Sequence, residues 1–316
     1  MLQLSTLRHI KKEVCYFMTI PTVNTMTFFD SQHLQEALKD SYFQHRQVTA
    51  GNFKGTLRRI ELPDIVIDSG SYNLKLLAEG ELSDQTVALI IVHRMKEGGI
   101  LCGEELSIGD LILLPVGSEM DLVMPEGTTW SCINVPQTHL KRYGVTILKS
   151  EIFHLNSVNF SHLSQRYERI LEYLTKNIFT EETLQDMIIS LLLNTIEENK
   201  NRIEFRYKDN YLVALNIKDY LMEHSESTVQ MYQLCELTGK SVRTIERIFK
   251  QAFSLSIRDF HTYHRFALIR QTLLHDKNTT VSNAALKYGY MHLGRFSQKY
   301  KEIFGELPSH TLEKAK

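Results

Sequence analysis

The feature that most constrains the fold is an internal repeat in the last third of the chain. The segment CELTG, Cys235 to Gly239, matches ALKYG, Ala285 to Gly289, at an offset of 50 residues. Later positions match at an offset of 51: Ile245, Phe249, Lys250 and Phe253 correspond to Phe296, Tyr300, Lys301 and Phe304. Self-similarity at a fixed short period indicates two copies of one supersecondary unit.

Each copy has the features of two helices joined by a tight turn. A small residue, Cys235 or Ala285, lets the helices approach closely, and the glycine four residues later ends the first helix. Ser241 is the expected N-cap of the following helix in the first copy. The apolar residues expected to face inward are Ile245, Ile248 and Phe249 in the first copy, and Phe296, Tyr300 and Phe304 in the second. This pattern predicts a helix-turn-helix, whose second helix enters the major groove of DNA.

A further helix is predicted between the two copies, from Ile257 to His275, with the sequence IRDFHTYHRFALIRQTLLH. At about 1.5 Å per residue it extends for about 27 Å, near the roughly 34 Å repeat of B-DNA. Two helices held at this separation can read successive major grooves on one face of a duplex. The segment AALKYGYMHLGRFSQKYKEIFGELPS, Ala284 to Ser309, is then the second of two readers on a rigid spacer.

Charge is distributed unevenly along the chain. Residues 208–316 contain 16 Lys and Arg and 11 Asp and Glu, a net charge of +5, whereas the preceding residues contain 20 and 26, a net charge of −6. A basic C-terminal part behind an acidic N-terminal part indicates that only the former meets a polyanion. Chance variation in surface charge is the alternative explanation.

The N-terminal part has the texture of a β domain. Short β-rich runs bounded by Gly, Pro, Asp or Ser fill residues 53–136: TLRRIEL, IVIDSG, TVALIIVHRM, GDLILLPVG, EMDLVMP and TWSCINVP. They predict an antiparallel sandwich or barrel. We expect Asp110–Pro115 and Trp130–Pro136 to pair as neighbours, joined through the turn PEGT at Pro125–Thr128. Residues 1–30 show little pattern, and residues 31–45 predict a short amphipathic helix opened by Ser31.

Residues 158–200 change to a helical period. Apolar residues at steps of three and four predict two helices separated by Asn177–Thr180, with Thr180 as the N-cap of the second. Their apolar stripe favours core packing, with a dimer seam as the alternative, and the polar segment Glu197–Tyr207 indicates a linker. The predicted fold class is therefore α+β. A β-rich regulatory domain covers residues 1–150, a helical hairpin and linker residues 151–207, and an all-α domain with two helix-turn-helix units residues 208–316.

The C-terminal part resembles the AraC/XylS family of bacterial transcription regulators. The resemblance is carried by LCELTGKSVRTIERIFKQAF in the first unit and GYMHLGRFSQKYKEIFGELPS in the second, over roughly residues 210–312. The segment GDLILLPVGSEMDLVMPEGTTWSCINVP resembles the cupin-like effector domain of one subgroup. The resemblance implies a cytoplasmic regulator of transcription that binds specific DNA sequences. Activation of transcription is the mode of regulation that it suggests. It also implies that a small effector or dimerisation acts through the N-terminal domain.

The resemblance also implies which residues face DNA. They are Arg243, Thr244, Glu246, Arg247 and Lys250 in the first unit, and His292, Leu293, Gly294, Arg295, Gln298, Lys299 and Lys301 in the second. Arginine can bond guanine and glutamate can accept from cytosine, whereas lysines at helix ends suit phosphate contacts. For each side chain taken alone, a solvated surface position is the alternative.

The sequence departs from the family pattern at several positions. Cys235 and Ile269 stand where alanine is usual, and Gln298 stands where arginine is frequent. Gly294 lowers helix propensity by about 1 kcal/mol relative to alanine. The second unit is therefore expected to hold DNA less strongly, or to read it through backbone and shape.

Rival functions find little support in the sequence. A metal-dependent cupin enzyme, the main alternative, would need an H-x-H pair that the β-rich region lacks, and His261 and His264 have no supporting cysteine or carboxylate. Nucleophile elbows, Walker loops and dinucleotide fingerprints are absent. We therefore predict no catalytic residue, metal or cofactor.

The setting and partners follow from the same sequence. Four scattered cysteines favour a reducing cytoplasm, and no apolar run is long enough to predict a membrane span. The partners considered besides double-stranded DNA are a small effector, RNA polymerase and a second copy of the chain. A third hypothesis is an interaction module that regulates without a ligand.

Overall fold

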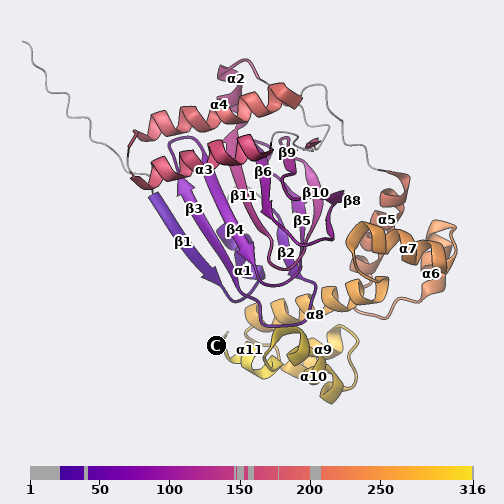
Figure 1. Ribbon diagram of the computed structural model, residues 1–316. Coiled ribbons are helices and arrows are strands. Elements are labelled where there is room, and N and C mark those ends of the chain that lie inside the picture. The colour runs from indigo at the N-terminus through magenta and orange to yellow at the C-terminus, as the bar shows by residue number, and fades with distance from the viewer. Residues whose placement is uncertain are drawn as a thin grey trace, which may run out of the picture.

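The structure is a computed structural model, and it describes residues 22–38, 42–145, 147, 153–155, 160–176, 178–199 and 208–314. A β domain comes first, a helical hairpin covers one side of it, and a helical domain follows (Figure 1). The fold is α+β, as predicted. No helix within the described ranges has the length and apolar character needed to cross a membrane.

The β domain consists of two antiparallel sheets. The first has the order β1 (Thr22–Phe28), β3 (Gly55–Glu61), β4 (Val66–Tyr72), β11 (Thr129–Pro136), β6 (Thr86–Arg94), β9 (Leu111–Leu114) and β12 (Phe153–Leu155). The second has the order β2 (Gln44–Gln47), β5 (Leu76–Glu81), β10 (Glu119–Met124), β7 (Gly99–Leu101) and β8 (Glu104–Leu106). Two short helices, α1 (Gln32–Ala37) and α2 (Gln137–Arg142), flank the strands.

Strand β6 shows why the β-rich runs are nearly continuous in apolar residues. Its alternate residues Ala88 and Ile90 belong to the interior core with Trp130, whereas Val87 and Leu89 belong to a second core. A sheet that is covered on both faces buries every residue, so the alternation of a half-exposed strand is lost. The second face is covered by the helical hairpin.

The hairpin consists of α3 (Phe160–Lys176) and α4 (Glu181–Asn199), which lie across the seven-stranded sheet (Figure 1). Tyr167 and Leu184 are buried against that sheet. The apolar stripe of the hairpin therefore packs into the core, which is the alternative that the sequence favours. The Thr180 hydroxyl accepts a hydrogen bond from the Thr183 amide at 3.3 Å, which confirms the predicted N-cap. Most of the predicted linker lies outside the described residues; its first three residues belong to α4.

The helical domain contains the two predicted units. Its helices are α5 (Asp209–Glu223), α6 (Met231–Thr238), α7 (Val242–Phe253), α8 (Ile257–His275), α9 (Val281–Lys287), α10 (Leu293–Phe304) and α11 (Pro308–Lys314). Helices α6 and α7 form the first unit, α9 and α10 form the second, and α8 connects them below the β domain (Figure 1).

The two units are buried differently. Phe249 and Phe253 of the first unit belong to one apolar cluster with the interior of the β domain, including Leu77 and Leu122. The second unit has a separate cluster around Phe266 and Phe296. The first unit is thus an extension of the β-domain core, while the second has a core of its own.

The structure corrects three expectations. Strand β11 pairs with β4 and β6, and β9 pairs with β6 and β12, so the two runs predicted to pair are separated by β6. The turn PEGT instead joins β10 to β11, which lie in different sheets. The helix predicted over residues 31–45 ends at Ala37, and Gln44–Gln47 is a strand. Residues 22–28 of the patternless lead-in form the edge strand β1, whose side chains are mostly exposed.

Candidate nucleic-acid interface

The first unit is built by the local signals that the sequence predicts. Gly239 ends α6 with φ of 66°, in the left-handed region, and a Cβ there would meet no atom within 4 Å. The Ser241 hydroxyl accepts a hydrogen bond from the Thr244 amide at 3.4 Å and so caps α7. Ile245 and Phe249 are fully buried, as predicted. The remaining face of α7 is left to solvent.

That face carries the predicted contact residues of the first unit. Arg243, Glu246, Arg247 and Lys250 are exposed, and Thr244 is half-buried beside the cap. Arg247 Nη1 donates to Gln251 Oε1 at 2.8 Å, a neutral partner that leaves the positive charge uncompensated. The contacts of these side chains with DNA stay a prediction.

The second unit repeats this construction with a more crowded turn. The Thr280 hydroxyl accepts from the Asn283 amide at 3.1 Å and caps α9. Gly289 has φ of 77°, and a Cβ there would lie 3.0 Å from the Glu226 carbonyl oxygen, so both conformation and space require glycine. Phe296 and Tyr300 are buried as predicted, whereas Phe304 is only partly buried.

The predicted contact residues of the second unit are all exposed. They are His292, Leu293, Gly294, Arg295, Gln298, Lys299 and Lys301. Lys299 Nζ lies 3.1 Å from Glu302 Oε2, and Gln298 Nε2 lies 3.5 Å from Glu302 Oε1. Glu302 therefore partly offsets the positive charge of this face.

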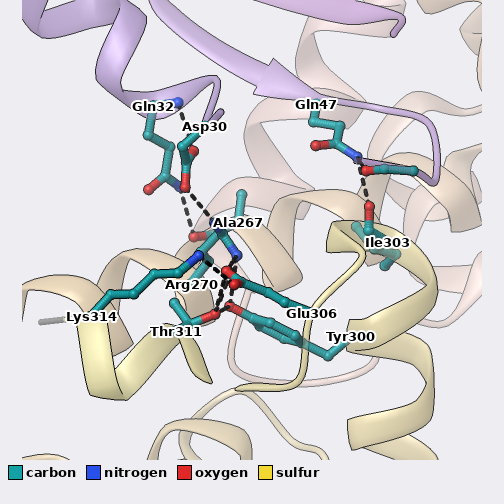
Figure 2. A network of polar contacts seen from close by, with 11 residues as sticks. Asp30, Gln32, Gln47, Ala267, Arg270, Tyr300, Ile303, Glu306, Thr311 and Lys314 are labelled. Carbon is teal, nitrogen blue, oxygen red and sulfur yellow. Dashed lines mark hydrogen bonds and ion pairs between the residues drawn. The ribbon is translucent and has the colours of Figure 1, made fainter. Parts of the chain in front are cut away.

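Two buried arginines of α8, which sequence reasoning missed, hold the second unit in place. Arg265 donates to the Tyr288 carbonyl next to the turn, and its guanidinium lies 4.4 Å from the centre of the Tyr290 ring. Arg270 forms ion pairs with Asp30 and Glu306 (Figure 2). Arg265 and Arg270 fall on the side of α8 that also carries Phe266, Ile269 and Leu273, and this placement is the signal that could have indicated buried partners.

The network around Arg270 joins three parts of the chain. Arg270 Nη1 lies 2.9 Å from Glu306 Oε1 and donates to Tyr300 Oη at 3.2 Å. Tyr300 Oη and Thr311 Oγ1 are 2.9 Å apart (Figure 2). Burial alone would lower the pKa of Arg270, but the negative charges of Asp30 and Glu306 outweigh burial and raise it. The guanidinium therefore stays charged in the interior.

Polar contacts also dock both units on the β domain. Lys75 Nζ donates to Ser254 Oγ at 2.7 Å at the end of α7, and Lys218 Nζ of α5 lies 2.7 Å from Asp121 Oδ1 of β10. At the second unit, Gln47 Nε2 donates to the Ile303 carbonyl at 2.6 Å (Figure 2). Polar side chains of the β domain thus contact the C-terminal ends of both α7 and α10.

One cleft brings acidic residues of the β domain to the first reading helix. Arg247 and Lys250 of α7 line a cleft of about 630 Å³ together with Glu104 and Glu105 of the β7–β8 hairpin. Carboxylates beside a phosphate-binding surface lower the local positive potential. Lys208, which lines the same cleft, places its Nζ 2.6 Å from Glu104 Oε1 and offsets part of this negative charge.

The interface between the domains also contains neutral histidines. His45 of β2 and His264 of α8 line a cavity of about 340 Å³ together with Arg46. Burial lowers the pKa of His264 to about 3, with a further decrease from the charge of Arg46. Burial likewise lowers the pKa of His45 to about 4. Both imidazoles are therefore neutral at pH 7.

Acidification is expected to destabilise the protein through these histidines. The unfolded chain binds their protons at its ordinary pKa of about 6.5, whereas the folded chain binds them only near pH 3–4. Above pH 6.5 both states leave these histidines neutral, and the free energy of unfolding is unaffected by them. As the pH falls below 6.5, only the unfolded chain takes up the protons, so the free energy of unfolding decreases. Urea unfolding at pH 7.5, 6.5 and 5.5 should show a falling free energy of unfolding. His264→Gln should reduce that slope, and replacement of the exposed His275 on the same helix should not.

The interior of the β domain holds a small, mainly apolar cavity. Its volume is about 50 Å³, and its lining includes His45, Tyr72, Trp130 and Met120. Trp130 Nε1 donates to Tyr72 Oη at 2.7 Å, so the aromatic lining is fixed. Among the described residues, no group of three or more His, Cys, Asp and Glu side chains is placed to hold a metal ion.

The comparisons with known proteins agree with the geometry of the helical domain. A family described as "Helix-turn-helix domain" matches residues 234–314. XylDLEGF operon transcriptional activator 2 of Pseudomonas putida is 28% identical over 128 residues, which cover 40% of this chain and 80% of the relative. A probable AraC family transcriptional regulator from Rhodopseudomonas palustris CGA009, of known crystal structure, is 30% identical; the match covers 33% of this chain and 98% of that one, with a TM-score of 0.32. The chain belongs to the AraC/XylS family.

Similarity to longer members of the AraC/XylS family is partial. The XylDLEGF operon transcriptional activator of Pseudomonas putida is 30% identical over 139 residues, which are 43% of this chain and 42% of that activator. The chain thus matches about two fifths of the length of that relative. The relatives are transcription regulators rather than enzymes.

Proposed function

We propose that this AraC/XylS protein is a sequence-specific DNA-binding regulator of transcription that places α7 and α10 in two major grooves of one duplex. The observation that carries the proposal is the pair of matched units on one helix, each with an exposed face of hydrogen-bonding and basic side chains. We assign the sequence-predicted contact residues of both helices to this interface. No catalytic role is proposed for the chain, and its place of action is the cytoplasm.

The β domain is proposed to regulate DNA binding. A small molecule in its interior, or pairing with a second copy, would act by favouring one arrangement of the domains over another. The contact of Lys75 with Ser254 and the cleft at Glu104 and Glu105 support this coupling, because they join the β domain to α7. The ion pair of Lys218 with Asp121 joins the β domain to the neighbouring helix α5. Contact with RNA polymerase is a further proposal for an activator of this family.

A binding titration tests the proposed function. The purified chain is mixed with duplexes selected from a random library, and the dissociation constant is measured by fluorescence anisotropy at several salt concentrations. A selected duplex should bind more tightly than a scrambled one, and log affinity should fall with log salt by about 0.9 for each phosphate neutralised. Equal affinity for selected and scrambled duplexes would reject the proposal.

A further inference from the structure

The start of the second reading helix exposes apolar surface. Met291, just before α10, is 78% exposed, and Leu293, its first residue, is 37% exposed. Scattered apolar side chains on a surface need no explanation. These two, however, flank the end of the helix that a helix-turn-helix presents to base edges. Apolar contact is therefore available where the chain is expected to meet the bases.

The next residue is Gly294, and no contact within the chain explains why this position is glycine. Its φ is outside the left-handed region, and an added Cβ would meet no atom within 4 Å. Neither backbone conformation nor packing therefore requires glycine, although alanine would favour the helix by about 1 kcal/mol. A bare backbone on an exposed helix face is useful when another molecule must approach closely.

Gln298 lies on the same side of α10 as Gly294, because residues four apart in a helix are neighbours on its surface. Its Nε2 lies 3.5 Å from Glu302 Oε1, at the limit of a hydrogen bond. The amide can therefore exchange this contact for a better one. Glutamine pairs in bidentate fashion with N6 and N7 of adenine.

We propose that the second unit reads an A·T pair, with Leu293 and Met291 packing on the 5-methyl group of a thymine. The proposal rests on the proposed function, in which α10 enters the major groove. Among the bases, only thymine presents a methyl group there. The missing side chain of Gly294 lets the helix approach the base edge, and Gln298 bonds the adenine of the same pair or of an adjacent one. The exposed face of α7 carries Arg243, Glu246 and Arg247, which suit G·C pairs, whereas α10 carries one arginine, Arg295, beside Leu293 and Gln298.

The test removes single methyl groups from the DNA. A selected duplex is resynthesised with each thymine replaced in turn by deoxyuridine, and the dissociation constant is measured with the full chain. The half-site of α10 is identified as the one whose base preference relaxes in an Arg295→Ala variant. One deoxyuridine in that half-site should weaken binding about fourfold, as expected for loss of one buried methyl group. In Leu293→Ala the same replacement should have a smaller effect, because only Met291 still packs on the methyl group, and in the double variant Met291→Ala/Leu293→Ala it should have none.

Two further variants separate DNA contact from folding. Gly294→Ala should raise the melting temperature and weaken binding of the selected duplex about tenfold. Leu286→Ala removes an exposed leucine of α9 (50% exposed) and should retain both the wild-type affinity and the deoxyuridine effect. Specific binding that tolerates deoxyuridine at every thymine of the α10 half-site, or a half-site without thymine, would overturn the inference alone. Failure to bind any duplex specifically would overturn the proposed function instead.

Discussion

Replacing Arg270 with alanine is expected to lower the free energy of unfolding by about 3–5 kcal/mol, the usual cost of removing one partner from a buried ion pair. The Arg270 side chain is 8% exposed, and that of Asp30 is equally buried. Without the guanidinium, the Asp30 carboxylate remains in the interior with no compensating charge. Urea unfolding at pH 7 measures the loss.

Matched variants show whether the buried charge is responsible. Arg258→Ala removes an exposed arginine of the same helix and should change the free energy of unfolding by no more than about 0.5 kcal/mol. Adding Asp30→Asn to Arg270→Ala should recover part of the loss, because asparagine leaves no buried charge. A loss below about 1 kcal/mol for Arg270→Ala would show that the network in Figure 2 contributes little to stability.

Replacing Arg247 with alanine is expected to weaken binding to a selected duplex by about 1–3 kcal/mol, roughly five- to 150-fold, and to relax the preference at one base pair. The exposed guanidinium can form a bidentate contact with guanine, and its present partner Gln251 is easily replaced. Fluorescence anisotropy against single-base variants of the duplex gives both quantities.

The control for Arg247→Ala is Arg169→Ala, which removes the same charge from the exposed surface of α3, away from the reading helices (Figure 1). It should leave specific affinity unchanged. If Arg247→Ala weakens every duplex equally, the side chain contacts a phosphate rather than a base. If it changes nothing, α7 does not read DNA through this residue.

The helix-turn-helix units could be predicted from the sequence because their signals are local. The turn glycine Gly239 and the N-cap Ser241 lie within a few residues of the helices that they define. The presence of a β domain and of the helical hairpin also follows from local periodicity. Which outward residues meet DNA depends on a second molecule, so those assignments are not settled by the fold.

The arrangement of the strands and the contacts between domains could not be predicted. Strand pairing depends on partners far away in the sequence, so nothing local revealed that β6 separates β9 from β11. Strand β1 could not be predicted, because an edge strand with mostly exposed side chains lacks an alternating apolar pattern. Asp30 and Arg270 are 240 residues apart, and each alone resembles an ordinary surface charge.

The unequal burial of the two units has a mechanical consequence. The first unit of the helical domain is joined to the β domain by continuous apolar packing, whereas the second is attached mainly by hydrogen bonds and ion pairs. Deformation imposed by a bent or unevenly spaced operator should therefore be taken up at the polar fastening. On the proposed function, we therefore expect variation in the distance between half-sites to be accommodated by movement of α10 rather than of α7.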